Sequence, residues 1–211
     1  MKRNSLITDL KERLYGSDIH MNPRVQNVDL SSGRRTNIVT FSIKDMILCM
    51  VSNKSLFNPS NLLLDPDNPL SPPKDTLYYG DVNTGSWHKE AIANECGSNP
   101  KHILMPFCHF IDGLAVDKYG KINVEAVLTC CLWFNRKARN RSSSWWIHGS
   151  IEDQILFRDQ TNYVRQEKLQ DYHDMMAKLF EEMRYIRDCD GTKINLNFGK
   201  YGTHKVIAIP V

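Results

Sequence analysis

The sequence predicts a mixed α/β fold in which antiparallel strands are followed by a long helix and a final strand pair. Two β-prone runs at 103–113 and 121–134 flank a turn signal around Gly120, which is typical of an antiparallel hairpin. The window 159–188 repeats apolar residues at helical spacing. A second turn signal at 199–202 separates two more β-prone segments. With 211 residues, the chain is long enough for one core and an appendage.

The first hundred residues predict an arm and an irregular extension. Residues 1–36 are polar and contain several turn-forming residues, which predicts a weakly ordered arm. An N-terminal extension at 37–100 is expected to begin with an amphipathic helix at 41–57, for which Ser42 is the predicted N-cap. The prolines concentrated within 58–76 favour an irregular linker, because proline interrupts regular elements.

Residues 101–211 are expected to form the core domain. A short helix at 86–95, with Ser86 as its cap, leads into it. After the hairpin, a third strand is predicted at 144–151, and the long helix is expected to end near Gly191. An RNase H-like domain begins with this order of three strands, a long helix and a strand, and carries an acid near the end of its first strand. The predicted fold is therefore α/β and RNase H-like, incomplete at its C-terminal side, with a helical and irregular N-terminal extension.

The composition restricts the function classes only broadly. Basic residues number 27 against 24 acidic ones, and the net charge of +3 is too small to identify a nucleic-acid-binding protein without local clustering. The cysteines form no C-x-x-C pair and the N-terminus has no apolar signal segment, which predicts an intracellular protein, nuclear if it functions in a eukaryote. No apolar run approaches the roughly 20 residues of a membrane span, so no membrane partner is expected.

Asp112 is the main candidate for a catalytic or metal-binding residue. In the apolar run at 103–113, Asp112 stands directly before Gly113, a placement that suits an acid holding a divalent cation. In the ordinary alternative, Asp112 and Gly113 form a turn at the end of the strand. Asp117 lies in the turn-forming segment DKYG and is better explained as a turn residue.

Four cations within six residues are the candidate nucleic-acid-binding element. Arginine and lysine at this density suit contacts with backbone phosphates, although charged runs are more commonly solvated loops between strands. The nearby Trp145 and Trp146 could stack on bases, but adjacent strand residues face opposite ways, so at least one is expected in the core. The basic cluster consists of Arg136, Lys137, Arg139 and Arg141.

The stretch at 110–127 followed by 134–151 resembles the first catalytic block of Plavaka-like DDE transposases, relatives of the Kyakuja-Dileera-Zisupton group. In that family a strand ends in an Asp-Gly pair, a second Asp precedes a glycine, and a strand and an Asn-Arg-x-x-Arg-Asn signature with a tryptophan follow. The resemblance extends over roughly residues 40–211, and it departs from the family pattern at 146–151, where a leucine-glycine-tyrosine run is usual. The matching residues are Asp112-Gly113, Asp117, Gly120, Asn135-Arg136, Arg139-Asn140 and Trp145 or Trp146.

The resemblance implies DNA cleavage and strand transfer with Mg²⁺ or Mn²⁺ in an ancestral protein, with Asp112 as the first of three metal-binding acids. The second acid is expected beyond the strand KVIAIPV, and the third further on. Two-metal phosphoryl transfer needs several carboxylates. The resemblance therefore predicts a truncated or degenerate transposase-derived protein, inactive as this fragment, that binds DNA weakly and without sequence preference. Two alternatives stay open: a non-catalytic DNA-binding or protein-interaction module, and an unrelated α+β domain that matches by chance.

Overall fold

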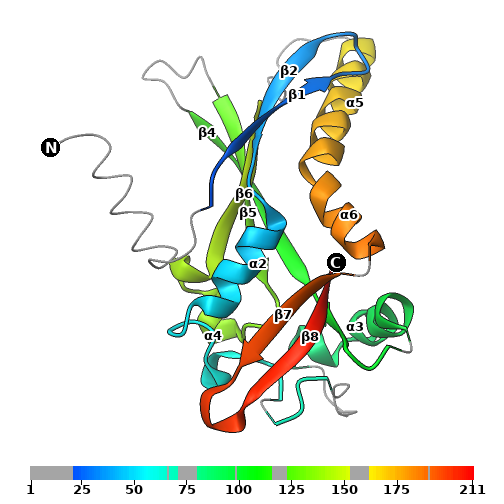
Figure 1. Ribbon diagram of the computed structural model, residues 1–211. Coiled ribbons are helices and arrows are strands. Elements are labelled where there is room, and N and C mark those ends of the chain that lie inside the picture. The colour runs from blue at the N-terminus through cyan, green and yellow to red at the C-terminus, as the bar shows by residue number, and fades with distance from the viewer. Residues whose placement is uncertain are drawn as a thin grey trace, which may run out of the picture.

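The structure is a computed structural model that describes residues 21–65, 67–70, 80–97, 99–115, 123–152, 162–189 and 191–211. These residues form a mixed α/β fold with a five-stranded and a three-stranded sheet (Figure 1). Asp117, the predicted turn at Gly120 and residues 1–20 of the predicted arm lie outside the described residues.

The five-stranded sheet contains the predicted hairpin and third strand. β4 (Phe107–Ala115) pairs antiparallel with β5 (Asn123–Cys131), which pairs antiparallel with β6 (Trp145–Glu152). Beyond β6 lie β2 (Arg35–Thr40) and β1 (Arg24–Asp29), also antiparallel. The order across the sheet is β1-β2-β6-β5-β4. The predicted antiparallel strands are confirmed, with their ends shifted by a few residues.

β1 and β2 show that the expectation of a weakly ordered arm at 1–36 is wrong over the part that the structure describes. In the turn between these strands, the backbone N–H groups of Ser31 and Ser32 donate to Asp174 Oδ2 at 2.7 Å and to Asp171 Oδ1 at 3.1 Å. Both carboxylates come from a helix in the C-terminal half of the chain. The composition of residues 1–36 could not reveal these two carboxylates as hydrogen-bond partners, because they lie far away in the sequence.

The three-stranded sheet has the order β3-β8-β7. β3 (His102–Met105) runs parallel to β8 (Thr203–Pro210), and β8 forms the predicted antiparallel hairpin with β7 (Thr192–Asn197). The sequence predicted a single strand at 103–113, but Pro106 divides it into β3 and β4. Proline has no N–H to donate to a ladder, so the chain leaves one sheet and enters the other at this residue.

The prediction that Ser42 caps the first helix is confirmed. α2 (Ile43–Ser52) begins after Ser42, whose hydroxyl accepts a hydrogen bond from the backbone N–H of Asp45 at 3.3 Å. The helix is shorter than the predicted 41–57, and its buried methionines pack into the main core. In the predicted linker at 58–76, the described part includes one short helical turn, η1 (Pro59–Asn61).

The second predicted helix begins at the expected residue but has a different cap. α3 (Ser86–Ala91) is preceded by Gly85, which has no side chain to cap it, so the prediction that Ser86 is the cap is wrong. A π-helical turn, η3 (Ile92–Cys96), continues α3. The remaining short helical segments are η2 (Val82–Thr84), α4 (Arg136–Arg139), η4 (Ser142–Ser144) and η5 (Gly199–Tyr201).

The long C-terminal helix is divided in two. α5 (Asn162–Leu179) and α6 (Glu181–Asp188) meet at Phe180, whereas the sequence predicted one helix over 159–188. The predicted end at Gly191 is confirmed by its φ of 77° and by its N–H, which donates to Ile186 O at 2.8 Å. Among the described residues, no helix has both the length and the apolar character that crossing a bilayer requires.

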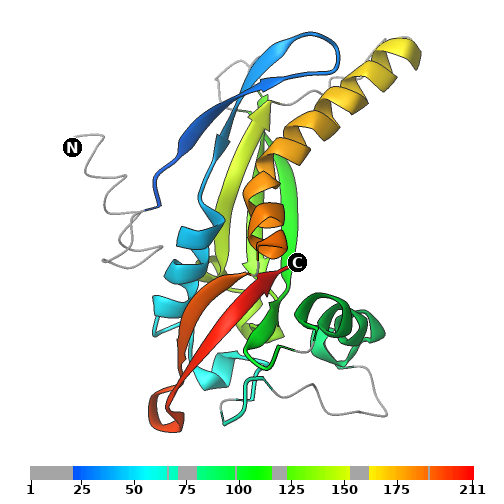
Figure 2. The ribbon, with the colours of Figure 1, turned by 45° about the vertical axis from the view of Figure 1, so that its right-hand side comes forward.

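The five-stranded sheet has two unlike faces. Its covered face packs against α5 (Figure 2), where Ile38, Val127 and Ile151 of the sheet form a buried cluster with Met175 and Leu179 of the helix. Directly paired residues of an antiparallel sheet lie on the same face. The register therefore places a second set of side chains together on the opposite, open face. The open face is defined by Phe110, Asp112, Leu128, Trp145 and Ile147.

Candidate functional site

Asp112 lies on the open face, exposed to solvent. It is opposite Ala126 in the β4–β5 ladder and three residues before the end of β4 at Ala115. Asp112 is therefore near the strand end, as predicted, but β4 continues through Gly113, so the two residues do not form the turn of the alternative interpretation. Among the described residues, no group of three or more histidine, cysteine, aspartate or glutamate side chains is arranged to hold a metal ion. The described residues alone therefore do not fit a two-metal centre, and Asp112 is a single candidate ligand.

The basic cluster lies in and just after α4, at the end of the sheet where β5 leads into that helix. Asn135 caps the helix, since its side-chain oxygen accepts from Ala138 N at 3.0 Å. Arg136, Lys137 and Arg141 are exposed, as contacts with phosphates require. Three cations of the cluster are thus displayed to solvent.

Arg139 has a different role from the other cations of the cluster. Its Nη2 donates to both carboxylate oxygens of Asp81, at 2.7 and 2.9 Å, and its side chain is only 17% exposed. The pair fastens the segment before η2 to α4. Arg139 was predicted to contact nucleic acid, but this geometry assigns it to internal pairing.

Aromatic side chains connect Asp112 with the basic cluster along the open face. The ring of Phe110, which is 51% exposed, meets the ring of Trp145 edge to face with centroids 6.5 Å apart. The Trp145 indole N–H donates to Arg139 O at 2.8 Å, at the end of α4. Trp146 faces the opposite way and is buried against Phe134. The prediction that at least one tryptophan belongs to the core is confirmed.

Asp112 and the basic cluster lie apart along the length of the sheet. Asp112 is five positions along β4 from Phe107, the residue that pairs with the end of β5 just before α4. At about 3.3 Å per residue, this separates Asp112 from that end of the sheet by roughly 17 Å. A single extended ligand could reach both, whereas a small ion could not.

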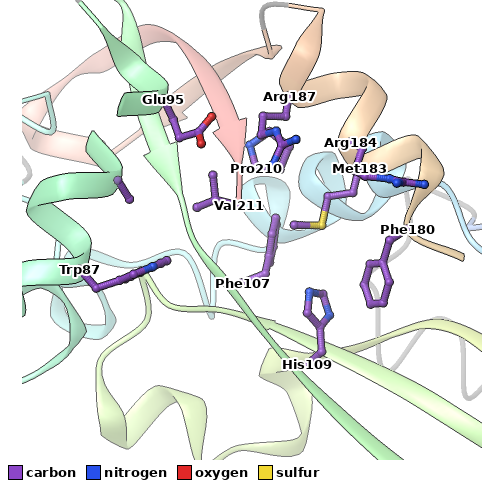
Figure 3. Close-up of a pocket in the computed structure, with 11 residues that line it drawn as sticks. Trp87, Glu95, Phe107, His109, Phe180, Met183, Arg184, Arg187, Pro210 and Val211 are labelled. Carbon is purple, nitrogen blue, oxygen red and sulfur yellow. The ribbon is translucent and has the colours of Figure 1, made fainter. Parts of the chain in front are cut away.

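A pocket of about 410 Å³ lies elsewhere on the molecule, between α3 and α6. Its walls come from α3 and η3, from the first residues of β4, from α6 and from the end of β8 (Figure 3). Sequence reasoning missed this pocket because its residues come from four separated segments. The only local signal was the spacing of Arg184 and Arg187, which puts both on one side of α6.

Two neutral histidines and a threonine form a hydrogen-bonded chain beneath this pocket. His109 Nδ1 lies 2.8 Å from Thr129 Oγ1, which lies 3.2 Å from His148 Nδ1, and His148 Nε2 lies 3.2 Å from Leu179 O. Burial lowers the pKa of His109 to about 4. Burial, with a smaller effect of His109, lowers the pKa of His148 to about 3. Both rings are therefore neutral at pH 7.

The geometry of this chain determines the tautomers. The carbonyl of Leu179 can only accept, so His148 Nε2 carries the proton and donates it. His148 Nδ1 then accepts from the hydroxyl of Thr129, whose oxygen accepts from the Nδ1–H of His109. The remaining nitrogen of His109, Nε2, is left as an acceptor, and His109 lines the pocket.

Comparison with known proteins leaves these sites without an assigned role. No protein-family model matches the chain, and no curated protein or solved structure matches it either.

Proposed function

We propose that this chain is a transposase-derived protein with part of an RNase H-like domain, and that it binds DNA weakly along its open face without cutting it. The observation that carries this proposal is the position of Asp112, which is solvent-exposed on a strand of the antiparallel β4-β5-β6 unit. It lies on the same face as the exposed side chain of Phe110 and the ring of Trp145, whose indole N–H reaches the backbone at the end of α4.

The chain topology supports the RNase H-like part of the proposal. After β4, β5 and β6 come α5 and α6, and the following hairpin brings β8 back parallel to β3. Because β3 directly precedes β4, β8 lies beside the segment that leads into β4, the strand that carries Asp112. A parallel return of this kind requires a crossover connection, which the two helices provide. β7 is an additional antiparallel edge strand.

The charges of the basic cluster support weak contact with backbone phosphates. Arg136, Lys137 and Arg141 are exposed on one short segment. Three phosphate contacts would give log K a slope of about −2.7 against log [salt], at about −0.9 for each contact. Contacts of this kind read no base edges, so binding is expected to be indifferent to sequence.

The described residues support no catalytic step. Two-metal phosphoryl transfer needs carboxylates that fix two cations about 4 Å apart. Asp112 alone provides one ligand, and Mg²⁺ held by one carboxylate keeps most of its waters. We therefore expect binding without cleavage from this chain, even when Mg²⁺ or Mn²⁺ is supplied.

The test is fluorescence anisotropy with a labelled DNA duplex at several salt concentrations. Replacing Arg136, Lys137 and Arg141 together by alanine should flatten the salt slope by up to about 2.7 units. Arg139 is left in place, because its pairing with Asp81 makes it part of the fold.

The matched control replaces three exposed lysines of the β7–β8 hairpin, Lys193, Lys200 and Lys205, by alanine. This variant loses the same charge and should keep the slope of the native protein. Equal slopes for the native protein and the basic-cluster variant would refute DNA contact by the cluster. In a parallel plasmid assay, divalent-dependent nicking that Asp112→Asn abolishes would show that the chain is catalytic.

A further inference from the structure

The pocket between α3 and α6 has the size and walls of a small-molecule site. Its volume of about 410 Å³ falls within the range of roughly 300–1,000 Å³ that is usual for such sites. Phe107 and Met183 give it apolar surface, and Trp87 stands at its edge with 51% of its surface exposed. Exposing so much of a tryptophan beside a cavity leaves a flat apolar surface for an aromatic ring.

The charged groups of the pocket favour a ligand with one negative charge. Arg184 and Arg187 of α6 line one wall, and Glu95 of η3 lies on another (Figure 3). Within the lining, two guanidinium groups face one carboxylate, and the Asp188 carboxylate, which lies outside the lining, pairs with Arg187 at 3.1 Å. The hydrogen bond of Arg184 to Ala177 O uses Nη2, and the contact of Arg187 with Asp188 uses Nε. A guanidinium carries five N–H donors, so each arginine retains donors for an anion.

The end of the pocket away from Glu95 and Arg187 adds a hydrogen-bond acceptor. Figure 3 shows His109 and Phe180 at one end of the pocket, with Glu95 and Arg187 at the other. The hydrogen-bonded chain through Thr129 leaves His109 Nε2 as an acceptor. A ligand that fills the pocket from end to end would therefore present an N–H or O–H to His109 and its anionic group to the arginines.

We propose that this pocket binds a small aromatic monoanion that carries one hydrogen-bond donor, such as an aryl carboxylate or sulfonate with an amine or hydroxyl group. The aromatic body packs between Trp87 and Met183, and the anionic group pairs with Arg184 and Arg187. The site lies between α3 and α6, and Asp112 lies on the open face of the sheet. It is therefore a separate function from the proposed DNA contact.

The probe is 1-anilinonaphthalene-8-sulfonate, which has two aromatic groups, one N–H and one negative charge. N-phenyl-1-naphthylamine has the same rings and N–H but no charge. The double variant Arg184→Gln/Arg187→Gln should weaken the sulfonate at least about tenfold, because hydrogen bonds to charged groups contribute roughly 1.5–3 kcal/mol. The uncharged probe should change by less than about twofold, because it makes no ionic contact.

Two further variants locate the bound probe. Trp87→Phe should reduce energy transfer from tryptophan to the bound sulfonate more than Trp145→Phe, because Trp87 lines the pocket and Trp145 lies on the open face. Lys44→Gln/Lys54→Gln removes two exposed cations outside the pocket and is the charge control. Circular dichroism checks that each variant is folded.

The proposal would be overturned if the arginine variant weakened both probes equally, or neither. It would also be overturned if Phe110→Ser/Ile147→Ser abolished sulfonate binding, because the probe would then lie on the exposed apolar side chains of the open face.

Discussion

The covered and open faces of the five-stranded sheet are built from alternate residues of the same strands, yet they contain different kinds of side chain. On β6, Ile151 is 1% exposed beneath α5, whereas Ile147 is 39% exposed on the open face, because a bulge opposite Val127 and Leu128 shifts the alternation between these two isoleucines. The covered face holds two neutral histidines, of which His148 is buried and His109 half-buried, and the open face displays Asp112 and Phe110. The comparison teaches that stability and surface chemistry are separated by strand alternation, so substitutions on the two faces should have different consequences.

The tight packing around Gly149, between β2 and α5, gives the largest expected effect. A Cβ added at Gly149 of β6 would lie 2.3 Å from the Val39 carbonyl oxygen and 2.5 Å from Leu179 Cδ1. Because one obstacle is backbone, the strands and α5 must move apart to make room. Gly149→Ala should lower the free energy of unfolding by roughly 3 kcal/mol, at the upper end of overpacking costs. Urea unfolding followed by circular dichroism measures this.

Gly113→Ala is the matched control for that substitution. A Cβ at Gly113 of β4 meets no atom within 4 Å. Alanine there should change stability by less than about 1 kcal/mol, because a methyl group in open space costs little and restricts the unfolded chain. Similar losses for the two variants would show that α5 does not lie against β6 as described.

The two isoleucines of β6 measure the difference between the faces with one residue type. Ile151→Ala should cost about 3 kcal/mol, because it leaves a cavity among Ile38, Met175 and Leu179. Ile147→Ala should cost no more than about 1 kcal/mol, since its side chain is already partly hydrated. Equal costs, measured by the same urea titration, would mean that something covers the open face in solution.

Local patterns predicted the parts of this fold that local interactions determine. The β4–β5 and β7–β8 pairings, the third strand and the Ser42 cap each follow from residues adjacent in sequence. The β1–β2 hairpin was missed because its turn is held by Asp171 and Asp174, which are distant in the chain. The break at Phe180 was missed because its cause is tertiary, since the ring packs against His109 and His148 on two strands.

The candidate sites show the same division between local and tertiary information. Asp112 and the exposed cations of the basic cluster were found in sequence because each depends on one short segment. Arg139 was misjudged because Asp81, its partner, lies 58 residues away. The pocket was invisible because Trp87, His109 and Arg187 meet only after folding.

The buried histidines make the covered face sensitive to acid. The pKa of His109 is about 4 in the folded protein, against the ordinary 6.5, so the unfolded chain binds more protons between these values. Stability is therefore complete above pH 6.5 and falls as the pH drops toward 4. The slope from His109 approaches about 1.4 kcal/mol per pH unit.

Unfolding free energies measured from pH 7 to pH 4.5 test this dependence. His109→Gln should flatten the curve, because it removes the titrating group from both states. The control is His173→Gln, which removes an exposed imidazole of α5. If the two variants have curves of equal slope, His109 does not titrate as a buried base.

Asp112→Asn is expected to have the smallest effect on stability and to report on the open face alone. Its side chain is solvent-exposed, so the free energy of unfolding should change by less than about 0.5 kcal/mol.

Asp112→Asn should instead affect the binding of Mn²⁺. A single carboxylate holds this ion weakly, and the bound ion broadens nearby amide resonances. In the native protein, low Mn²⁺ concentrations should broaden the amides next to Asp112 on β4 and that of Ala126 across the ladder. Asp112→Asn should remove this broadening, whereas Glu90→Gln, at an exposed acid of α3, should not. Broadening that persists around Ala126 in Asp112→Asn would assign the ion to another group. A large loss of stability would instead show that Asp112 belongs to the structure of the sheet rather than to its surface chemistry.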